Sequence, residues 1–274
     1  MAYEYVFDLG SSTAKLYRRL STERLNYVAS ASWCLLEDST STIDTGKVLA
    51  TLSALHQHCS GPACAIGTEV FRRREELSRE VEGICSQLGI TFRVISQSEE
   101  AKLIRTACNK SEVPKAFAII NVGGGSIQIV HPGTMNLSLL PFGVVDVARR
   151  FNLNSTPDDR YTCEAVSWVK SQLPSIGDSF AYTGGERTYL TQVGARIAAD
   201  GTCTAIEFSR VASRLAAMPL SELKLESPFD PDWMRGAIAS NCIVTALIEQ
   251  CGCDAFLATD NNIAHGLLAE VVNK

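Results

Sequence analysis

Three glycine turns hold the residues of this sequence best suited to contact phosphate. Asp8-Leu9-Gly10-Ser11-Ser12-Thr13 follows an apolar segment, Asn121 to Ser126 contains three consecutive glycines, and Gly184-Gly185 closes a third apolar segment. Because glycine has no side chain, backbone amides in such turns can approach an anion closely. The first turn alone fits a tight hairpin equally well, but three turns after three apolar segments favour binding. The predicted phosphate or nucleotide site comprises Asp8, Gly10, Ser11, Ser12, Thr13, Gly123, Gly124, Gly125, Ser126, Gly184 and Gly185.

Charged side chains lie between the first and second turns. Arg72 to Arg74 begin a predicted helix, and arginine suits planar, bidentate recognition of phosphate. For at least one of these arginines the simpler expectation is a solvated helix face paired with Glu75 and Glu76. Glu99 and Glu100 begin another predicted helix, where a glutamate beside a bound phosphate could position or deprotonate a water.

The order of apolar segments and turns repeats once along the chain. Three strand-like segments up to Trp33 predict an antiparallel meander, followed by alternating helices and strands that include an arginine-rich helix over 70–88. The order strand, glycine turn, two strands and helix then recurs. It predicts an α/β protein of two ribonuclease-H-like, actin-like lobes around a central cleft. The predicted lobes are 1–113 joined by a C-terminal helix over 262–274, and 114–261.

Composition excludes several classes of function. The 274 residues carry a net charge of -5, which argues against nucleic-acid binding. Apolar runs stay short of the roughly 20 residues of a membrane span, and the first residues lack the pattern of a secretory signal. The ten cysteines are scattered, and neither the group His56 to Cys64 nor Cys251 and Cys253 has the spacing of a zinc site. We expect reduced thiols and a cytoplasmic protein.

The motifs together resemble the exopolyphosphatase and guanosine pentaphosphate phosphatase (Ppx/GppA) family, within the sugar kinase and actin superfamily. The resemblance rests on five collinear segments: DLGSST, GTEVFRR, SEEAKLI, NVGGGSIQIV and LLPFGVV. It implies release of terminal phosphate from polyphosphate or a guanosine pentaphosphate-type nucleotide, with Mg²⁺ or another divalent cation. By resemblance, Glu100 activates water and Arg72 contacts phosphate. The absence of a further C-terminal helical domain, which larger relatives have, favours short-chain polyphosphate or nucleotides.

Two positions depart from the family pattern. The second turn normally reads DIGGGSTE, and here Asn121 and Gln128 replace its two acids. The family's acids are associated with the metal, and amides are poorer ligands of a hard dication. The expected metal ligands are therefore Asp8 and Glu100, with weaker roles for Asn121 and Gln128. Three consequences stay open: a metal held mainly by Asp8, Glu100 and substrate, a lower dependence on metal, or binding without turnover.

Other classes of function remain open at this point. The two amides motivate a non-catalytic sensor that binds polyphosphate or a guanosine tetraphosphate-type nucleotide. A small-molecule kinase is a further alternative, because Gly184 and Gly185 could face an adenosine. A homodimer is expected from the resemblance alone, with no nucleic acid or membrane as partner.

Overall fold

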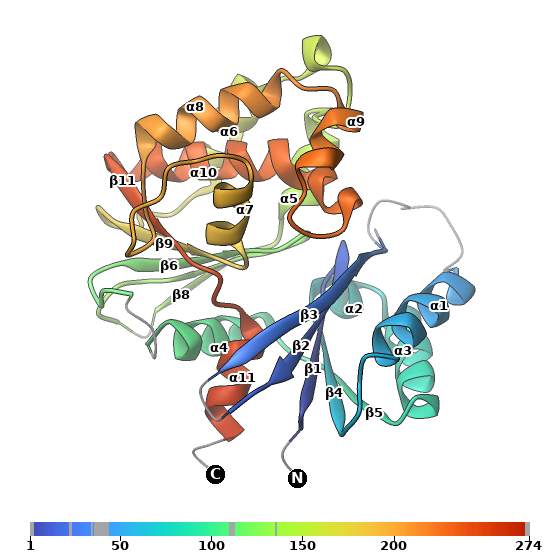
Figure 1. Cartoon of the computed structure of the whole chain (residues 1–274). Helices are drawn as coiled ribbons and strands as arrows, with labels where there is room; N and C mark the ends of the chain where they lie inside the picture. The colour runs from blue at the N-terminus through green and yellow to red at the C-terminus, as the bar shows by residue number, and fades with distance from the viewer. Residues whose placement is uncertain are drawn as a thin grey trace. The chain divides into compact units, whose positions relative to one another are not determined.

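A computed structural model describes residues 3–21, 24–33, 35, 44–109, 113–134 and 136–271. The chain divides into two compact units (Figure 1). The first unit combines Met1–Ala107 with Ile263–Lys274, and the second comprises Cys108–Asn262. Each unit has its own sheet and its own hydrophobic core.

The first unit contains a five-stranded sheet in the order β3-β2-β1-β4-β5. Its first three strands form the predicted antiparallel meander, and the other two run parallel to β1. The strands are β1 (Tyr5–Leu9), β2 (Thr13–Arg19), β3 (Leu25–Ser32), β4 (Ala63–Gly67) and β5 (Ile90–Val94). The helices are α1 (Thr45–His56), α2 (Glu69–Arg73), α3 (Glu75–Gln87), α4 (Gln97–Asn109) and α11 (Ile263–Val271).

The predicted helix over 70–88 is two helices. Arg74 has φ -126° and ψ 86°, outside the helical region, and separates α2 from α3. The break leaves Arg72 and Arg73 in the last turn of a short helix that begins directly after β4. The two arginines therefore lie next to the strand ends rather than along one long solvated face.

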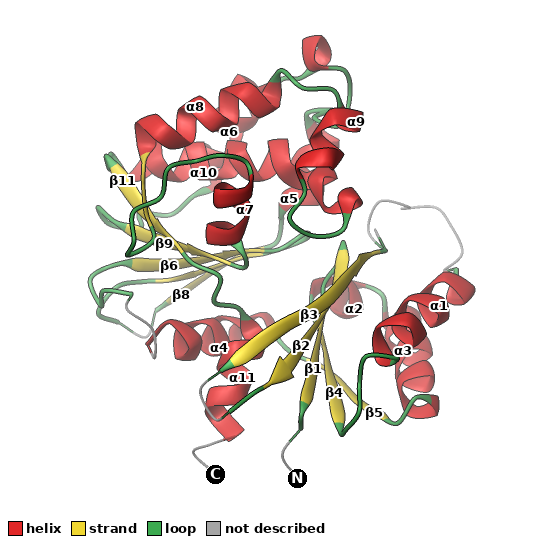
Figure 2. Cartoon of the chain, in the orientation of Figure 1, coloured by secondary structure: helices red, strands yellow, loops and turns green. Residues whose placement is uncertain are grey.

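The second unit contains a six-stranded sheet in the order β10-β11-β9-β6-β7-β8. Its strands are β6 (Ala118–Val122), β7 (Ile127–Val130), β8 (Leu137–Leu140), β9 (Phe180–Thr183), β10 (Thr202–Thr204) and β11 (Ala255–Ala258). The helices α6, α8 and α10 gather on one side of this sheet (Figure 2). The helices are α5 (Val144–Arg150), α6 (Thr162–Gln172), α7 (Glu186–Gln192), α8 (Ala205–Ala216), α9 (Leu220–Leu223) and α10 (Ala237–Cys251), with 3₁₀ turns at Pro157–Asp159, Lys224–Glu226 and Pro231–Gly236.

The chain order within each sheet places the glycine turns at strand ends. The first turn joins β1 to β2, the second joins β6 to β7, and the third follows β9. In the second sheet, β6 is flanked by β7 and β9, so the second and third turns leave neighbouring strands. Among the described residues, no helix is long and apolar enough to cross a membrane.

Candidate functional site

The first glycine turn is anchored through its carbonyl groups. The carbonyl of Gly10 accepts from the Trp33 indole Nε1 at 2.9 Å. The carbonyl of Ser11 accepts from the Leu35 backbone N–H at 2.9 Å, and that of Ser12 from the Trp33 backbone N–H at 3.0 Å. The residues that follow β3 therefore hold three consecutive carbonyls of the turn.

This anchoring fixes the direction of the turn's amides. In a trans peptide the C=O and the following N–H point in opposite directions, and the described chain has no cis peptide bond. The N–H of Ser11 thus points away from the Trp33 indole and the N–H of Ser12 away from the Leu35 backbone, and neither donates to another described residue. The Ser11 Oγ is also buried without a hydrogen-bond partner. Unpaired backbone N–H groups in a glycine turn are the type of donor that can bind an anion.

Trp33 also connects the first glycine turn to α2, the helix that carries Arg72 and Arg73. Its side chain is buried, and its ring meets the Phe71 ring edge-on with centroids 6.1 Å apart. Phe71 packs in the same way against Phe92, at 5.6 Å, and directly precedes Arg72. Lys47 Nζ donates to the Trp33 carbonyl at 3.2 Å. Trp33 is not among the site residues predicted from the sequence, although a buried indole N–H generally requires an acceptor nearby.

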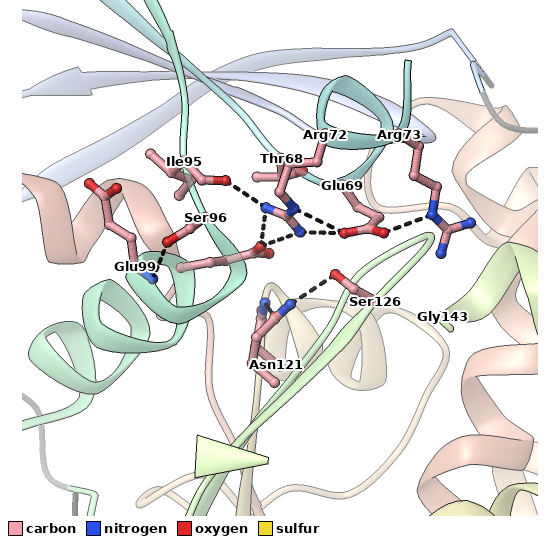
Figure 3. A network of polar contacts seen from close by, with 12 residues as sticks. Thr68, Glu69, Arg72, Arg73, Ile95, Ser96, Glu99, Asn121, Ser126 and Gly143 are labelled. Atoms are coloured by element: carbon pink, nitrogen blue, oxygen red, sulfur yellow. Dashed lines mark hydrogen bonds and ion pairs between the residues drawn. The ribbon is translucent and has the colours of Figure 1, made fainter. Parts of the chain in front are cut away.

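Arg72 is held through all of its nitrogens. Its Nε and Nη2 donate to Glu69 Oε2 at 3.0 and 2.6 Å. Its Nη1 and Nη2 donate to Glu100 Oε2, both at 3.1 Å, and Nη1 also donates to the Ile95 carbonyl at 2.8 Å. These contacts, drawn in Figure 3, match the full number of guanidinium N–H groups. A phosphate oxygen could reach Arg72 only by sharing or replacing one of these acceptors.

Glu69 is a site residue that the sequence analysis did not select. Besides Arg72, it accepts from Arg73 Nε at 2.7 Å through its other oxygen, Oε1. Its position at the start of α2 places a carboxylate near the helix N-terminus, where negative charge is favoured. Glu69 therefore fixes the side chains of both arginines.

Glu100 is a buried carboxyl group whose proton affinity is high. Only 4% of the residue is exposed, and burial raises its pKa to about 7 although the Arg72 charge opposes the shift. The negative charges of Asp8 and Glu69 raise this pKa further. Burial also raises the pKa of Asp8, against the attraction of Lys15. A carboxyl group with a pKa near neutrality can exchange protons with a water at physiological pH.

The second glycine turn is also anchored by hydrogen bonds to its carbonyl groups. The N–H of Val144 donates to the Gly123 carbonyl at 3.0 Å, and that of Val145 donates to the Gly124 carbonyl at 2.8 Å. The donors belong to the first turn of α5. A Cβ at Gly143 would collide with the backbone of Gly123 and Gly124, so only glycine permits this approach. Gly143 is the glycine of LLPFGVV, one of the five segments that resemble the family.

Polar side chains form a row across three neighbouring strands of the second sheet. Asn121 on β6 lies opposite Thr183 on β9 and opposite Gln128 on β7. Asn121 Nδ2 donates to Gln128 Oε1 at 2.6 Å, and Gln128 Nε2 donates to Ser126 Oγ at 2.8 Å. The Thr183 hydroxyl donates to the Ile120 carbonyl at 3.1 Å and shares this proton with Asn121 Oδ1 at the longer distance of 3.4 Å. We call Thr183, Asn121, Gln128 and Ser126 the amide row; Figure 3 shows its bond to Ser126. All four residues are buried.

The third glycine turn leads into a buried carboxyl group. Gly184 and Gly185 have φ of 104° and 113°, in the region that favours glycine. Glu186 follows as the first residue of α7 and is 4% exposed, and its Oε1 has no hydrogen-bond partner. Burial, reinforced by the charge of Asp260, raises the pKa of Glu186 to about 8. The sequence analysis did not select Glu186.

The predicted site residues fall into two groups. The first unit brings together Asp8, Gly10, Ser11, Ser12, Thr13, Arg72 and Glu100, and the second brings together Asn121, Gly123, Gly124, Gly125, Ser126, Gln128, Gly184 and Gly185. No group of three or more His, Cys, Asp or Glu suited to a metal ion occurs within the described ranges. The roles assigned to these residues remain predictions.

Two mixed α/β units, with glycine turns at their strand ends, define a two-lobe, actin-like fold. The chain belongs to the Ppx/GppA phosphatase family, whose model matches residues 39–271. The predicted fold class and family resemblance are thereby confirmed. No curated protein matches the sequence.

Solved structures agree with this assignment. An exopolyphosphatase from Cytophaga hutchinsonii is similar with a TM-score of 0.77 at 16% identity, covering 98% of this chain and 97% of that one. An Aquifex aeolicus member of the Ppx/GppA family has a TM-score of 0.72 at 15% identity, covering 98% and 97%. At such identities the likeness shows the fold.

The anchoring of the first turn predicts that Trp33→Phe weakens both stability and anion binding. Phenylalanine keeps a ring against Phe71 but leaves the Gly10 carbonyl without its donor, which should lower the free energy of unfolding by about 1–3 kcal/mol. Affinity for tripolyphosphate, measured by calorimetry, should also fall. Trp168→Phe is the matched control, because Trp168 packs against Phe142 in the other unit. Equal effects of the two changes on tripolyphosphate affinity would contradict the role of Trp33.

Glu186 predicts a pH-dependent loss of stability. Its pKa is about 8 in the folded protein, well above the ordinary glutamate value, so folding favours the protonated form. Its stabilising contribution is complete at acidic pH and is lost as the pH rises toward 8. The free energy of unfolding of Glu186→Gln, relative to that of the wild type, should therefore rise by about 2 kcal/mol between pH 5.5 and pH 7.5. Urea unfolding at several pH values measures this, with the exposed Glu164→Gln as control; a pH-independent difference would refute it.

Proposed function

We propose that this chain hydrolyses a terminal phosphoanhydride of short-chain polyphosphate or of a guanosine pentaphosphate-type nucleotide. The observation that carries the proposal is the buried Glu100, whose pKa lies near 7 and whose Oε2 is fixed by Arg72. Membership of a phosphatase family supports hydrolysis as the reaction. The anchored first turn, in the same unit as Glu100, supports phosphate as the ligand.

In the proposed reaction Glu100 takes a proton from a water while the water oxygen bonds to the terminal phosphorus. The bond from that phosphorus to the bridging oxygen breaks, and its electron pair leaves with the shortened chain. The N–H groups of Ser11 and Ser12 bind oxygens of the ligand, where fixed donors stabilise developing charge. Arg72 holds the Glu100 carboxylate in place. Any direct contact of Arg72 with phosphate exchanges one of its present acceptors for the ligand.

Phosphatases of this family generally use divalent cations. The carboxyl groups of Asp8 and Glu100 have the oxygen donors that Mg²⁺ prefers, and both lie in the first unit. Asn121 and Gln128 fit a cation poorly, because their amide groups bond to each other. No step of the proposed reaction is assigned to a metal. The cytoplasmic location and the homodimer stay predictions from the sequence.

The amide row also supports a second candidate, a protein that binds polyphosphate or a guanosine tetraphosphate-type nucleotide without turnover. Two neutral side chains stand where the family pattern has acids. In this case ligand binding would persist while no phosphate is released. No comparable observation supports a small-molecule kinase. Transfer of phosphate to an acceptor other than water would be the evidence for that function.

Glu100→Gln provides the first test of the hydrolase. Glutamine cannot accept the proton of water, so phosphate release from tripolyphosphate should fall by about 10²–10⁴-fold while calorimetric binding persists. Glu99→Gln is the matched control, because Glu99 adjoins Glu100 but pairs with Arg93 on an exposed surface. Release that survives in Glu100→Gln would exclude Glu100 as the base. Binding without release by the wild type would favour the sensor.

The pH profile provides a second, independent test. The base must be deprotonated, and its pKa in the free protein is about 7, so kcat/KM should rise with pH through this value and then level off. The Glu99→Gln variant should keep the same profile. A profile that is flat between pH 6 and 8 would argue against Glu100 as the group that titrates.

A further inference from the structure

Within the amide row, each contact among Asn121, Gln128 and Ser126 pairs one donor with one acceptor. Asn121 and Gln128 lie directly opposite each other on antiparallel strands, so their side chains share one face of the sheet. The amide nitrogen of Asn121 meets the amide oxygen of Gln128, and the Gln128 nitrogen meets Ser126 Oγ. The row therefore satisfies buried polar groups with uncharged partners. Gln128 is 1% exposed, which makes these bonds costly to break.

Two carboxylates could not form the same row by themselves. With Asp at 121 and Glu at 128, two acceptors would face each other across the present 2.6 Å contact between the amide groups. Like charges at such a distance require a shared proton or a cation between them. A divalent cation would supply the missing positive charge and accept oxygen ligands from both side chains.

The same geometry leaves little for a cation to bind in this chain. The Gln128 oxygen already accepts a short hydrogen bond, and the Asn121 oxygen shares the Thr183 proton with the Ile120 carbonyl. A cation at this place would have to displace a buried N–H donor while gaining two neutral ligands in place of two anionic ones. Hard dications prefer carboxylates and water over such a site.

We infer that the amide row takes the place of a divalent cation at the second glycine turn. The row closes this turn without metal, and it orients the Ser126 hydroxyl, which accepts from Gln128 and so directs its own proton elsewhere. A role of the oriented Ser126 hydroxyl toward phosphate rests on the proposed function. The replacement of the cation follows from the side chains of the row alone.

Restoring the acids one at a time and together tests the inference. A single Asn121→Asp or Gln128→Glu leaves one amide, which can turn to donate to the new carboxylate, so each single variant should fold without metal. The double variant Asn121→Asp, Gln128→Glu has no donor between its carboxylates. In EDTA at neutral pH its melting temperature should fall about 5–10 °C below the sum of the single effects. Mn²⁺ should restore the melting temperature of the double variant, and should raise it more than it raises that of the wild type or of either single variant.

A count of bound Mn²⁺ by electron paramagnetic resonance gives a second readout. The double variant should bind one ion more than the wild type, whatever ions bind elsewhere in both. An equal count, or a double variant that Mn²⁺ fails to restore, would overturn the inference. So would an ion bound by the wild type and lost in Gln128→Met, a change that keeps side-chain volume.

These measurements are independent of turnover. A wild type that releases no phosphate would refute the proposed hydrolase and leave the ion count untouched. An unchanged ion count would refute the inference about the row and leave the hydrolase standing.

Discussion

The structure of the first and second glycine turns depends on hydrogen bonds to their carbonyls. An isolated glycine turn could present either face of its peptides to a ligand, because glycine allows many backbone conformations. In the first turn Trp33 and Leu35 hold three consecutive carbonyls, and in the second turn the start of α5 holds two. Since each trans peptide points its N–H opposite to its C=O, these contacts decide which way the amides face. The orientation of the amides in these turns is thus set by residues outside the turns.

The charged groups of the first unit are likewise positioned by their hydrogen-bond partners. Arg72 bonds to two carboxylates and one carbonyl, so its charge is balanced before any ligand arrives. This balance is only partial for Glu100, whose pKa remains near 7 because burial outweighs the attraction of Arg72. A stronger pairing with Arg72 would lower the pKa of Glu100. As it is, Arg72 orients the carboxyl group, which still exchanges a proton near neutral pH.

The sequence was informative where one residue type was demanded by local geometry. The glycines at 123–125 and 184–185, with the apolar segments before the turns, sufficed to predict the turns, the strands that precede them and the class of fold. Local signals failed elsewhere. Arg74 is neither glycine nor proline, yet it interrupts the helix over 70–88. Trp33, Glu69 and Glu186 acquire their roles from partners distant in sequence or from burial, and the pairing of Asn121 with Gln128 depends on strand register.

The first unit is discontinuous in sequence, and this bears on how the protein forms. Helix α11 packs on the first sheet through Ala264, beside Val6, Tyr17 and Cys64. Gly266 approaches the backbone of Leu103 so closely that no Cβ fits there, and Leu103 lies one helical turn from Glu100. The helix that carries the proposed base therefore lacks its packing partner until residues 263–271 have been synthesised. During translation the whole of the second unit is therefore synthesised before this contact between α11 and α4 can form.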